Sequence, residues 1–227
     1  MLDVARRILP GCLVVACLLL AAACDSPDGE ASAPATDRVV HEEGEGPLSA
    51  HTGLGDQAIA QPGKPPWKAS FGSFLLCSTT GAEIEIEDVR FVTKVEPQRA
   101  EAWFRTIPEA SERNGGKPIS WSPIGMLWGS HPDYLDGTRM HGDFRRTMDG
   151  PLAVDCEDLA DPDNGRVELV TVLSVGETGA WVQQTHVDYR VAGAPYTLVI
   201  RWQNLACGTE IPKRFWCPKL RRIPMVG

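Results

Sequence analysis

The chain has 227 residues, with 22 basic and 30 acidic side chains and a formal net charge of -8. This acidic average argues against nucleic acid as a partner, because binding to phosphates requires a basic surface. Of the seven cysteines, three lie within the first 24 residues and four in the rest of the chain.

The N-terminus has the layout of a secretory signal. Arg6 and Arg7 form a positive region, and 16 uncharged, mostly apolar residues follow before Cys24. An uncleaved membrane anchor is the alternative, but it needs roughly 20 apolar residues, and Pro10 and Gly11 interrupt this run. We therefore expect residues 1–23 to be a signal peptide that is removed before Cys24.

The residues at the cleavage point resemble the lipobox of bacterial lipoproteins. Ala21-Ala22-Ala23 precedes Cys24, and the sequence ending at Cys17 also fits but would leave a shorter apolar region. The resemblance implies that the Cys24 thiol is diacylated, and two acyl chains hold a protein stably on a membrane. We expect a protein anchored through Cys24 to membrane lipid, on the outer, extracytoplasmic face of the cell membrane.

The segment after the anchor predicts a disordered tether over residues 24–70. It is rich in Pro, Gly, Ala, Ser and acidic residues, and it has almost no large apolar side chains before Trp67. Such a composition buries too little surface to offset the entropy lost on ordering. His41 and His51 are interpreted as solvated residues of this tether.

Residues 71–227 have the length of one domain, and their periodicity is typical of β-strands. Phe71–Cys77 predicts a strand. Ile84–Ile86 and Val89–Phe91 alternate in opposite phase, which predicts a bulge at Glu87-Asp88. The segment from 101 to 107 favours a strand over a short helix, and a further short strand is expected at Ala153-Val154.

The strongest pattern lies between Val167 and Asn204. Apolar residues alternate with polar ones through three runs, separated by turns at Gly176–Gly179 and Ala192–Pro195. This pattern predicts a three-stranded meander. Together the runs predict an all-β, antiparallel two-sheet sandwich.

The predicted sandwich resembles the immunoglobulin-like domains of secreted bacterial proteins and, more loosely, the envelope lipoproteins of high-GC Gram-positive bacteria. The features concerned are the lipobox, Cys77 in the first strand, the strand from Glu83 to Arg90, and the hairpin through Val187–Arg190 that ends at Cys207. The resemblance concerns architecture and implies no activity.

Four cysteines remain after the signal and the lipidated residue are set aside. They predict two disulfides, because the predicted compartment is oxidising. The sequence contains no Cys-x-x-Cys pair of the kind that binds zinc. The pairing is open among three patterns: we favour Cys77 with Cys207 and Cys156 with Cys217, and Cys77 with Cys156 and Cys207 with Cys217 is nearly as well supported.

The sequence contains no serine-hydrolase elbow, zinc-protease motif or phosphate loop. Each histidine of the domain is, however, followed two residues later by aspartate, a combination that suits a divalent metal. We favour the interpretation that these are solvated loop residues and the polar face of a strand. The candidate metal ligands are His131, Asp133, His141, Asp143, His186 and Asp188.

A long loop concentrates aromatic side chains between residues 121 and 144, and aromatic faces can stack on sugars or peptides. The candidate ligand-binding residues are Trp121, Trp128 and Tyr134, with Asp133 able to bind hydroxyls. The alternative, which we favour, is that Trp121, Met126 and Trp128 cover the open end of the sandwich.

These observations together predict a lipid-anchored, non-enzymatic binding or interaction module of the cell envelope. We expect no cofactor, and an envelope protein or glycan as the partner. The competing hypothesis is a metal-dependent hydrolase that uses the three His-x-Asp pairs.

Overall fold

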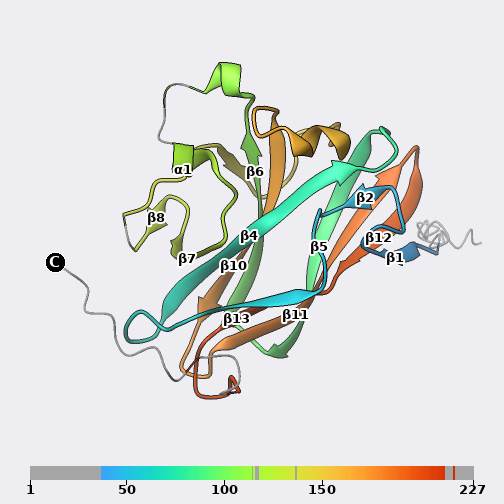
Figure 1. Cartoon of the computed structure of the whole chain (residues 1–227). Helices are drawn as coiled ribbons and strands as arrows, with labels where there is room; N and C mark the ends of the chain where they lie inside the picture. The colour runs from blue at the N-terminus through green and yellow to red at the C-terminus, as the bar shows by residue number, and fades with distance from the viewer. Residues whose placement is uncertain (1–36, 114, 116–117, 136, 213–216, 218–227) are drawn as a thin grey trace, which may run out of the picture. The chain divides into compact units, whose positions relative to one another are not determined.

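Two packed β-sheets make up the described part of the chain (Figure 1). The computed structural model describes residues 37–113, 115, 118–135, 137–212 and 217, so the predicted signal peptide and Cys24 lie outside the described residues. The all-β sandwich is confirmed. Among the described residues, no helix has the length and hydropathy needed to cross a membrane. The helical elements are the single turn α1 (Pro118–Trp121) and the short 3-10 segments η1 (Ala110–Glu112) and η2 (Glu157–Ala160).

The first sheet has six strands, with β11 at its centre. β11 pairs antiparallel with β5 along one edge and with β12 and β13 along the other, while β1 pairs with β12 and β3 with β13 in parallel. These two outer pairs are exceptions to the predicted antiparallel pairing. The strands are β1 (Val39–Glu42), β3 (Gly55–Ile59), β5 (Ile84–Val95), β11 (Ala180–Val191), β12 (Ala194–Ile200) and β13 (Trp202–Ala206).

The second sheet has seven strands in the order β8-β7-β4-β10-β6-β9, and β2 pairs with β4 at its far end. All of its pairs are antiparallel. The strands are β2 (Leu48–Ser49), β4 (Trp67–Ser78), β6 (Arg99–Ile107), β7 (Met126–Ser130), β8 (Asp133–Tyr134), β9 (Asp143–Arg145) and β10 (Arg166–Val175).

The main core lies between the sheets. Alternate side chains of each strand point to the same face, so Phe74 and Leu169 of one sheet meet Val187 and Leu198 of the other, and all four are buried. Burying each such side chain contributes about 1.5–3 kcal/mol relative to leaving it exposed. The period-two patterns of the sequence thus become the two inner faces of the sandwich.

Several local predictions are confirmed. The strand predicted at Phe71–Cys77 is part of β4, and residues 101–107 belong to the strand β6. Ile86 lies opposite Tyr189 and Asp88 opposite Asp188, which leaves Glu87 as the extra residue of the predicted bulge. The strand expected at Ala153-Val154 is wrong, since its neighbours make only isolated bridges to other strands.

The predicted meander is wrong in one respect. β11 and β12 form the expected hairpin, but β10 pairs with β4 and β6 in the other sheet. The turn at Gly176–Gly179 therefore carries the chain from one sheet to the other. Alternation shows which face of a strand is buried but not which strand it pairs with. The sequence therefore could not show whether β10 pairs with β11 or with strands of the other sheet.

The predicted tether is wrong for the part that the structure describes. Residues 38–59, here called the N-terminal strap, contribute β1, β2 and β3, and His41 is only 6% exposed. β1 adds to one sheet, β2 to the other, and β3 returns to the first. The strap is ordered because it completes the edges of existing sheets, which requires few large apolar side chains. Residues 24–36 of the predicted tether lie outside the described residues.

The four cysteines form two disulfides, Cys77–Cys156 and Cys207–Cys217, with S–S distances of 2.09 and 2.04 Å. The favoured pairing is wrong and the second pattern is confirmed. Cys77 lies near the end of β4 in the seven-stranded sheet, whereas Cys207 follows β13 in the six-stranded sheet. The first long strand and the last strand are thus not neighbours, which removes the premise of the favoured pairing.

Candidate functional site

The long aromatic loop folds onto the seven-stranded sheet. We call residues 118–145 the cover segment. Its Ile124 and Tyr134 are buried against Val170 and Val172, on the face of β10 that points away from the other sheet, and Phe144 packs beside them. The segment therefore covers a sheet face and not the open end of the sandwich that the sequence suggested.

A buried ion pair lies under the cover segment. The Nη1 atom of Arg105 in β6 is 2.9 Å from Oε2 of Glu168 in β10, and both side chains are 0% exposed. Burial raises the pKa of the Glu168 carboxyl, while Arg105 and two backbone N–H groups act in the opposite direction. A buried charge is tolerated only when it is paired and hydrogen-bonded.

Both members of this pair hold the cover segment. Arg105 donates hydrogen bonds to the carbonyl oxygens of Ser120, Ser122 and His141, at 2.7–2.8 Å. Glu168 accepts one from the backbone N–H of Ile124 at 2.6 Å. This pair was not predicted from the sequence, although a charged residue inside each apolar strand was a visible signal.

The candidate metal ligands of the cover segment contact aromatic rings. The ring of His131 stacks on Phe144 with centroids 3.9 Å apart, and that of His141 stacks on Trp121 at 4.8 Å. Burial lowers the pKa of His131 below its ordinary value, and Arg105 adds to this effect.

The third pair lies in the other sheet. His186 of β11 contacts the Gln184 side chain at 3.0 Å, and Asp188 accepts two hydrogen bonds from Arg90 and one from Thr197. Asp143, in the cover segment, pairs with Arg145 at 2.7 Å. The three His-x-Asp pairs are thus not brought together, and the described residues contain no group of three side chains placed to hold a metal ion.

One groove combines the cover segment with the chain that leads into β4. The groove has a volume of about 420 Å³, and we call it the β4–β8 groove. Residues 62–68 form one wall and residues 129–135 the other. It is lined by Pro62, Gly63, Lys64, Pro66, Trp67, Lys68, Gly129, Ser130, Asp133 and Leu135.

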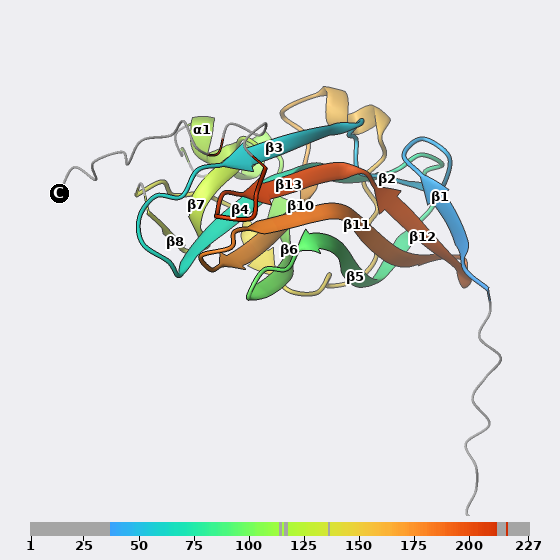
Figure 2. The same ribbon diagram turned by 90° about the horizontal axis from the view of Figure 1, so that it is seen from below.

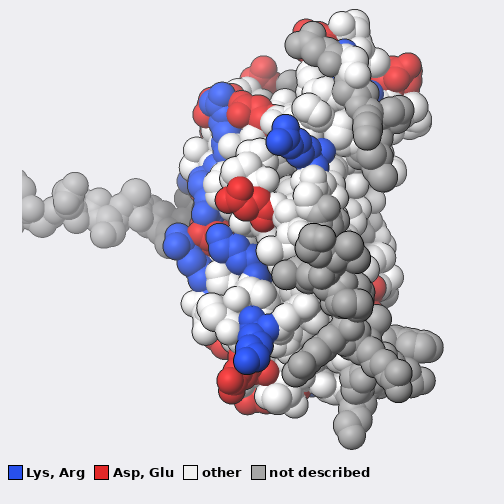
Figure 3. All heavy atoms as spheres, turned by 90° about the vertical axis from the view of Figure 1, so that its left-hand side faces the viewer, with Lys and Arg blue, Asp and Glu red and all other residues white. Residues whose placement is uncertain are grey.

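Three charged side chains of this groove have no ion-pair partner among the described residues. They are Lys64, Lys68 and Asp133, and all three are exposed. Lys68 donates one hydrogen bond, of 3.3 Å, to the hydroxyl of Ser130. On the side of the molecule that carries β7 and β8, Lys and Arg side chains are prominent (Figure 3), although the chain as a whole is acidic.

Most charged side chains around the cleft between β5 and β6 are, by contrast, already in ion pairs, with Asp88 as the exception among the described residues. This cleft has a volume of about 320 Å³. Its Glu101 pairs with Arg99 at 2.8 Å and also with Arg146. A larger cleft, of about 550 Å³, is built mainly from turns around residues 106–112 and 153–167. Of these three clefts, the β4–β8 groove is the one lined by a predicted ligand-binding residue, Asp133.

The predicted aromatic ligand residues do not line the groove. Tyr134 is 7% exposed, and burial raises its pKa to about 12. Trp128 donates its indole N–H to the carbonyl of Ala60 at 2.8 Å, and Trp121 lies against His141. These rings serve packing. Lys64 and Lys68 were not predicted as site residues, because both fall in the predicted tether, although the segment Pro62-Gly-Lys-Pro-Pro-Trp67 leads directly into the first long strand.

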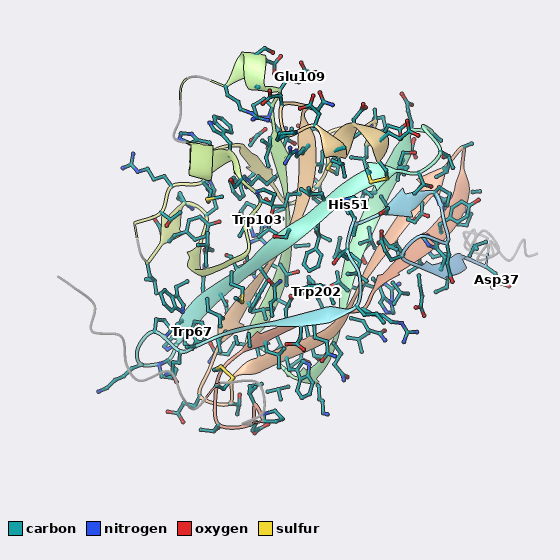
Figure 4. The ribbon with its side chains drawn as sticks, in the orientation of Figure 1. Asp37, His51, Trp67, Trp103, Glu109 and Trp202 are labelled. Carbon is teal, nitrogen blue, oxygen red and sulfur yellow. A yellow bond between two sulfur atoms is a disulfide. The ribbon has the colours of Figure 1, made fainter. Side chains whose placement is uncertain are left out.

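The groove lies far from the point where the preceding chain enters the fold. Asp37 and Trp67 are at opposite ends of the described domain (Figure 4), and β1 is likewise remote from β7 and β8 (Figure 2). Comparisons with protein-family models, with curated proteins and with solved structures found no match for this chain.

Proposed function

We propose that this protein is a non-enzymatic binding module, held on the outer face of the cell membrane through acylated Cys24, which contacts an envelope partner through the β4–β8 groove. The anchor is supported by the signal and lipobox pattern before Cys24. The observation that carries the binding role is a largely apolar groove with three unpaired charges at its rim.

The supporting walls of the groove suit this role. Residues 67–68 and 129–130 lie in paired strands of one sheet, and the Arg105–Glu168 pair holds the cover segment onto that sheet. Binding sites on rigid elements lose less entropy when a ligand binds. A concave, mainly apolar site with a few polar groups is the usual form of a ligand site.

The length of chain between the proposed anchor and the domain also agrees with a binding role in the envelope. Twelve residues lie between Cys24 and Asp37, and the chain from one to the other spans at most about 45 Å. The β4–β8 groove lies at the end of the domain opposite Asp37, the described residue closest in sequence to Cys24. A tether of this length leaves the groove room to reach proteins or glycans of the envelope.

Photo-crosslinking in the native envelope tests this proposal. A photoreactive amino acid replaces Leu135, which lines the groove and is 50% exposed, or Val92 of β5, which is 41% exposed on the other sheet. We expect a discrete adduct from position 135 and none from position 92. Equal adducts from both positions, or none from position 135, would contradict the proposal.

A further inference from the structure

We infer that the β4–β8 groove recognises an acidic peptide segment of a partner protein, in which an apolar side chain is flanked by carboxylates. This inference rests on the proposed function and specifies its ligand. It is carried by the chemistry of the two walls, by the burial of the neighbouring aromatic rings, and by the position of the groove in the domain.

The walls offer aliphatic surface and no aromatic platform. Pro62, Pro66 and Leu135 line the groove, and Leu135 is 50% exposed. Trp67 and Tyr134 are only 6% and 7% exposed, so their faces are not free to stack on a sugar ring. An apolar amino-acid side chain matches these walls better than a glycan does.

The charges at the rim of the groove favour a ligand that carries negative charge. Lys64 and Lys68 lie on one wall and are exposed without ion-pair partners among the described residues, whereas Asp133 lies on the other wall. Carboxylates of a peptide would pair with the two ammonium groups, and Asp133 would accept hydrogen bonds from peptide N–H groups. Complementary charges of this kind chiefly give specificity and faster association.

The position of the groove argues against anionic lipid head groups as the source of the negative charge. Trp67 lies at the end of the domain opposite Asp37, through which the anchored segment joins the fold (Figure 4). Contact between the groove and the anchoring membrane would require the domain to turn the end opposite Asp37 toward the lipid. A protein segment has no such restriction.

Selection from a random heptapeptide library on phage tests the inference. The bait is the full lipidated protein in nanodiscs, compared with the Lys64→Glu/Lys68→Glu double variant. We expect the wild type to enrich peptides with Asp or Glu beside an apolar residue, and the double variant to enrich Lys or Arg instead. Lys94→Glu, in β5 of the other sheet, is the matched control and should keep the acidic preference.

Each outcome of the two experiments has a different meaning. Absence of enrichment, or an acidic preference that survives the double substitution, overturns the acidic-peptide inference. An adduct from position 135 to a glycan or lipid overturns the ligand class but keeps the binding module. Absence of any adduct from that position contradicts the proposed function itself. Because both lysines are exposed, circular dichroism should show the double variant folded.

Discussion

At the scale of single residues, the buried Arg105–Glu168 pair explains how a segment poor in regular structure is held in place. Arg105 satisfies three carbonyl groups of the cover segment, and Glu168 satisfies a backbone N–H of the same segment. Such a network is costly to break because each freed group would stay buried without a partner.

Arg105→Ala should therefore lower the free energy of unfolding by about 3–5 kcal/mol, the cost of removing one partner from a buried pair. Arg145→Ala is the control, because its pair with Asp143 is about half exposed, and exposed pairs contribute at most about 1 kcal/mol. Urea denaturation of both variants measures the difference. Equal losses would show that the buried pair has no special structural role.

His131 should make stability depend on pH. Burial lowers its folded-state pKa below the ordinary value of 6.5, so between these two values the unfolded chain binds more protons and stability falls as the pH falls. His131→Phe keeps a ring against Phe144 and removes the titration. Its melting temperature should drop less than that of the wild type between pH 6.5 and 5.

The exposed His51, changed to Asn, is the matched control for this pH experiment. We expect its melting temperature to follow that of the wild type. Identical drops in the wild type and in His131→Phe would refute the assignment of the pH dependence to His131.

At the scale of elements, the N-terminal strap joins the two sheets through one hydroxyl group. The hydroxyl of Tyr189 in β11 contacts Nε2 of His41 at 2.6 Å and accepts a hydrogen bond from the backbone N–H of Leu48 at 3.3 Å. Gly46 allows the backbone of the strap to pass close to His41, because a Cβ atom at position 46 would lie 2.4 Å from the His41 ring. Arg38 adds an ion pair to Glu87 of β5.

Tyr189→Phe should lower the free energy of unfolding by about 1–3 kcal/mol, since it leaves buried polar groups of His41 and Leu48 without a partner. Hydrogen exchange at the Leu48 amide should accelerate. Tyr196→Phe is the control, as its ring stacks on Tyr189 but its hydroxyl makes no hydrogen bond among the described residues. Loss of stability in both variants alike would argue against a specific role for the Tyr189 hydroxyl.

At the scale of the whole molecule, the two disulfides close loops of very different length. Cys77–Cys156 spans 79 positions and Cys207–Cys217 spans 10. The longer one links the end of β4 to the segment before η2, and the shorter one links the end of β13 to the C-terminal region. A disulfide that closes a longer loop removes more entropy from the unfolded chain.

Replacing Cys77 and Cys156 together by Ala should cost about 4.5 kcal/mol, and replacing Cys207 and Cys217 about 2.7 kcal/mol, according to the loop-entropy relation. Urea unfolding of the two double variants tests the order. A larger loss from the shorter loop would mean that packing around Cys207, and not loop closure, dominates.

The proposed anchor has a direct test. Cys24→Ala should abolish labelling with radioactive fatty acid and leave the precursor uncut or release the protein into the medium. Cys17→Ala, which removes the alternative lipobox, should keep both labelling and processing. Fatty-acid labelling that persists in Cys24→Ala would refute acylation at this residue.

Much of the fold could be predicted because it depends on local periodicity. Period-two alternation located β4, β6, β10, β11 and β12, and a change of phase located the bulge at Glu87. An even number of cysteines after a predicted secretory signal indicated two disulfides. The strands and the bulge depend on which face of a strand is buried, and that information lies in residues close together in the sequence.

Only the tertiary structure decided which strands are neighbours. The assignment of β10 to the second sheet, the ordering of the N-terminal strap and the cysteine pairing depend on contacts between residues far apart in the sequence. The same is true of the site: Lys64 and Asp133 line one groove because β4 and β7 pair. Alternation alone cannot specify such partners, since any strand with a buried face satisfies it.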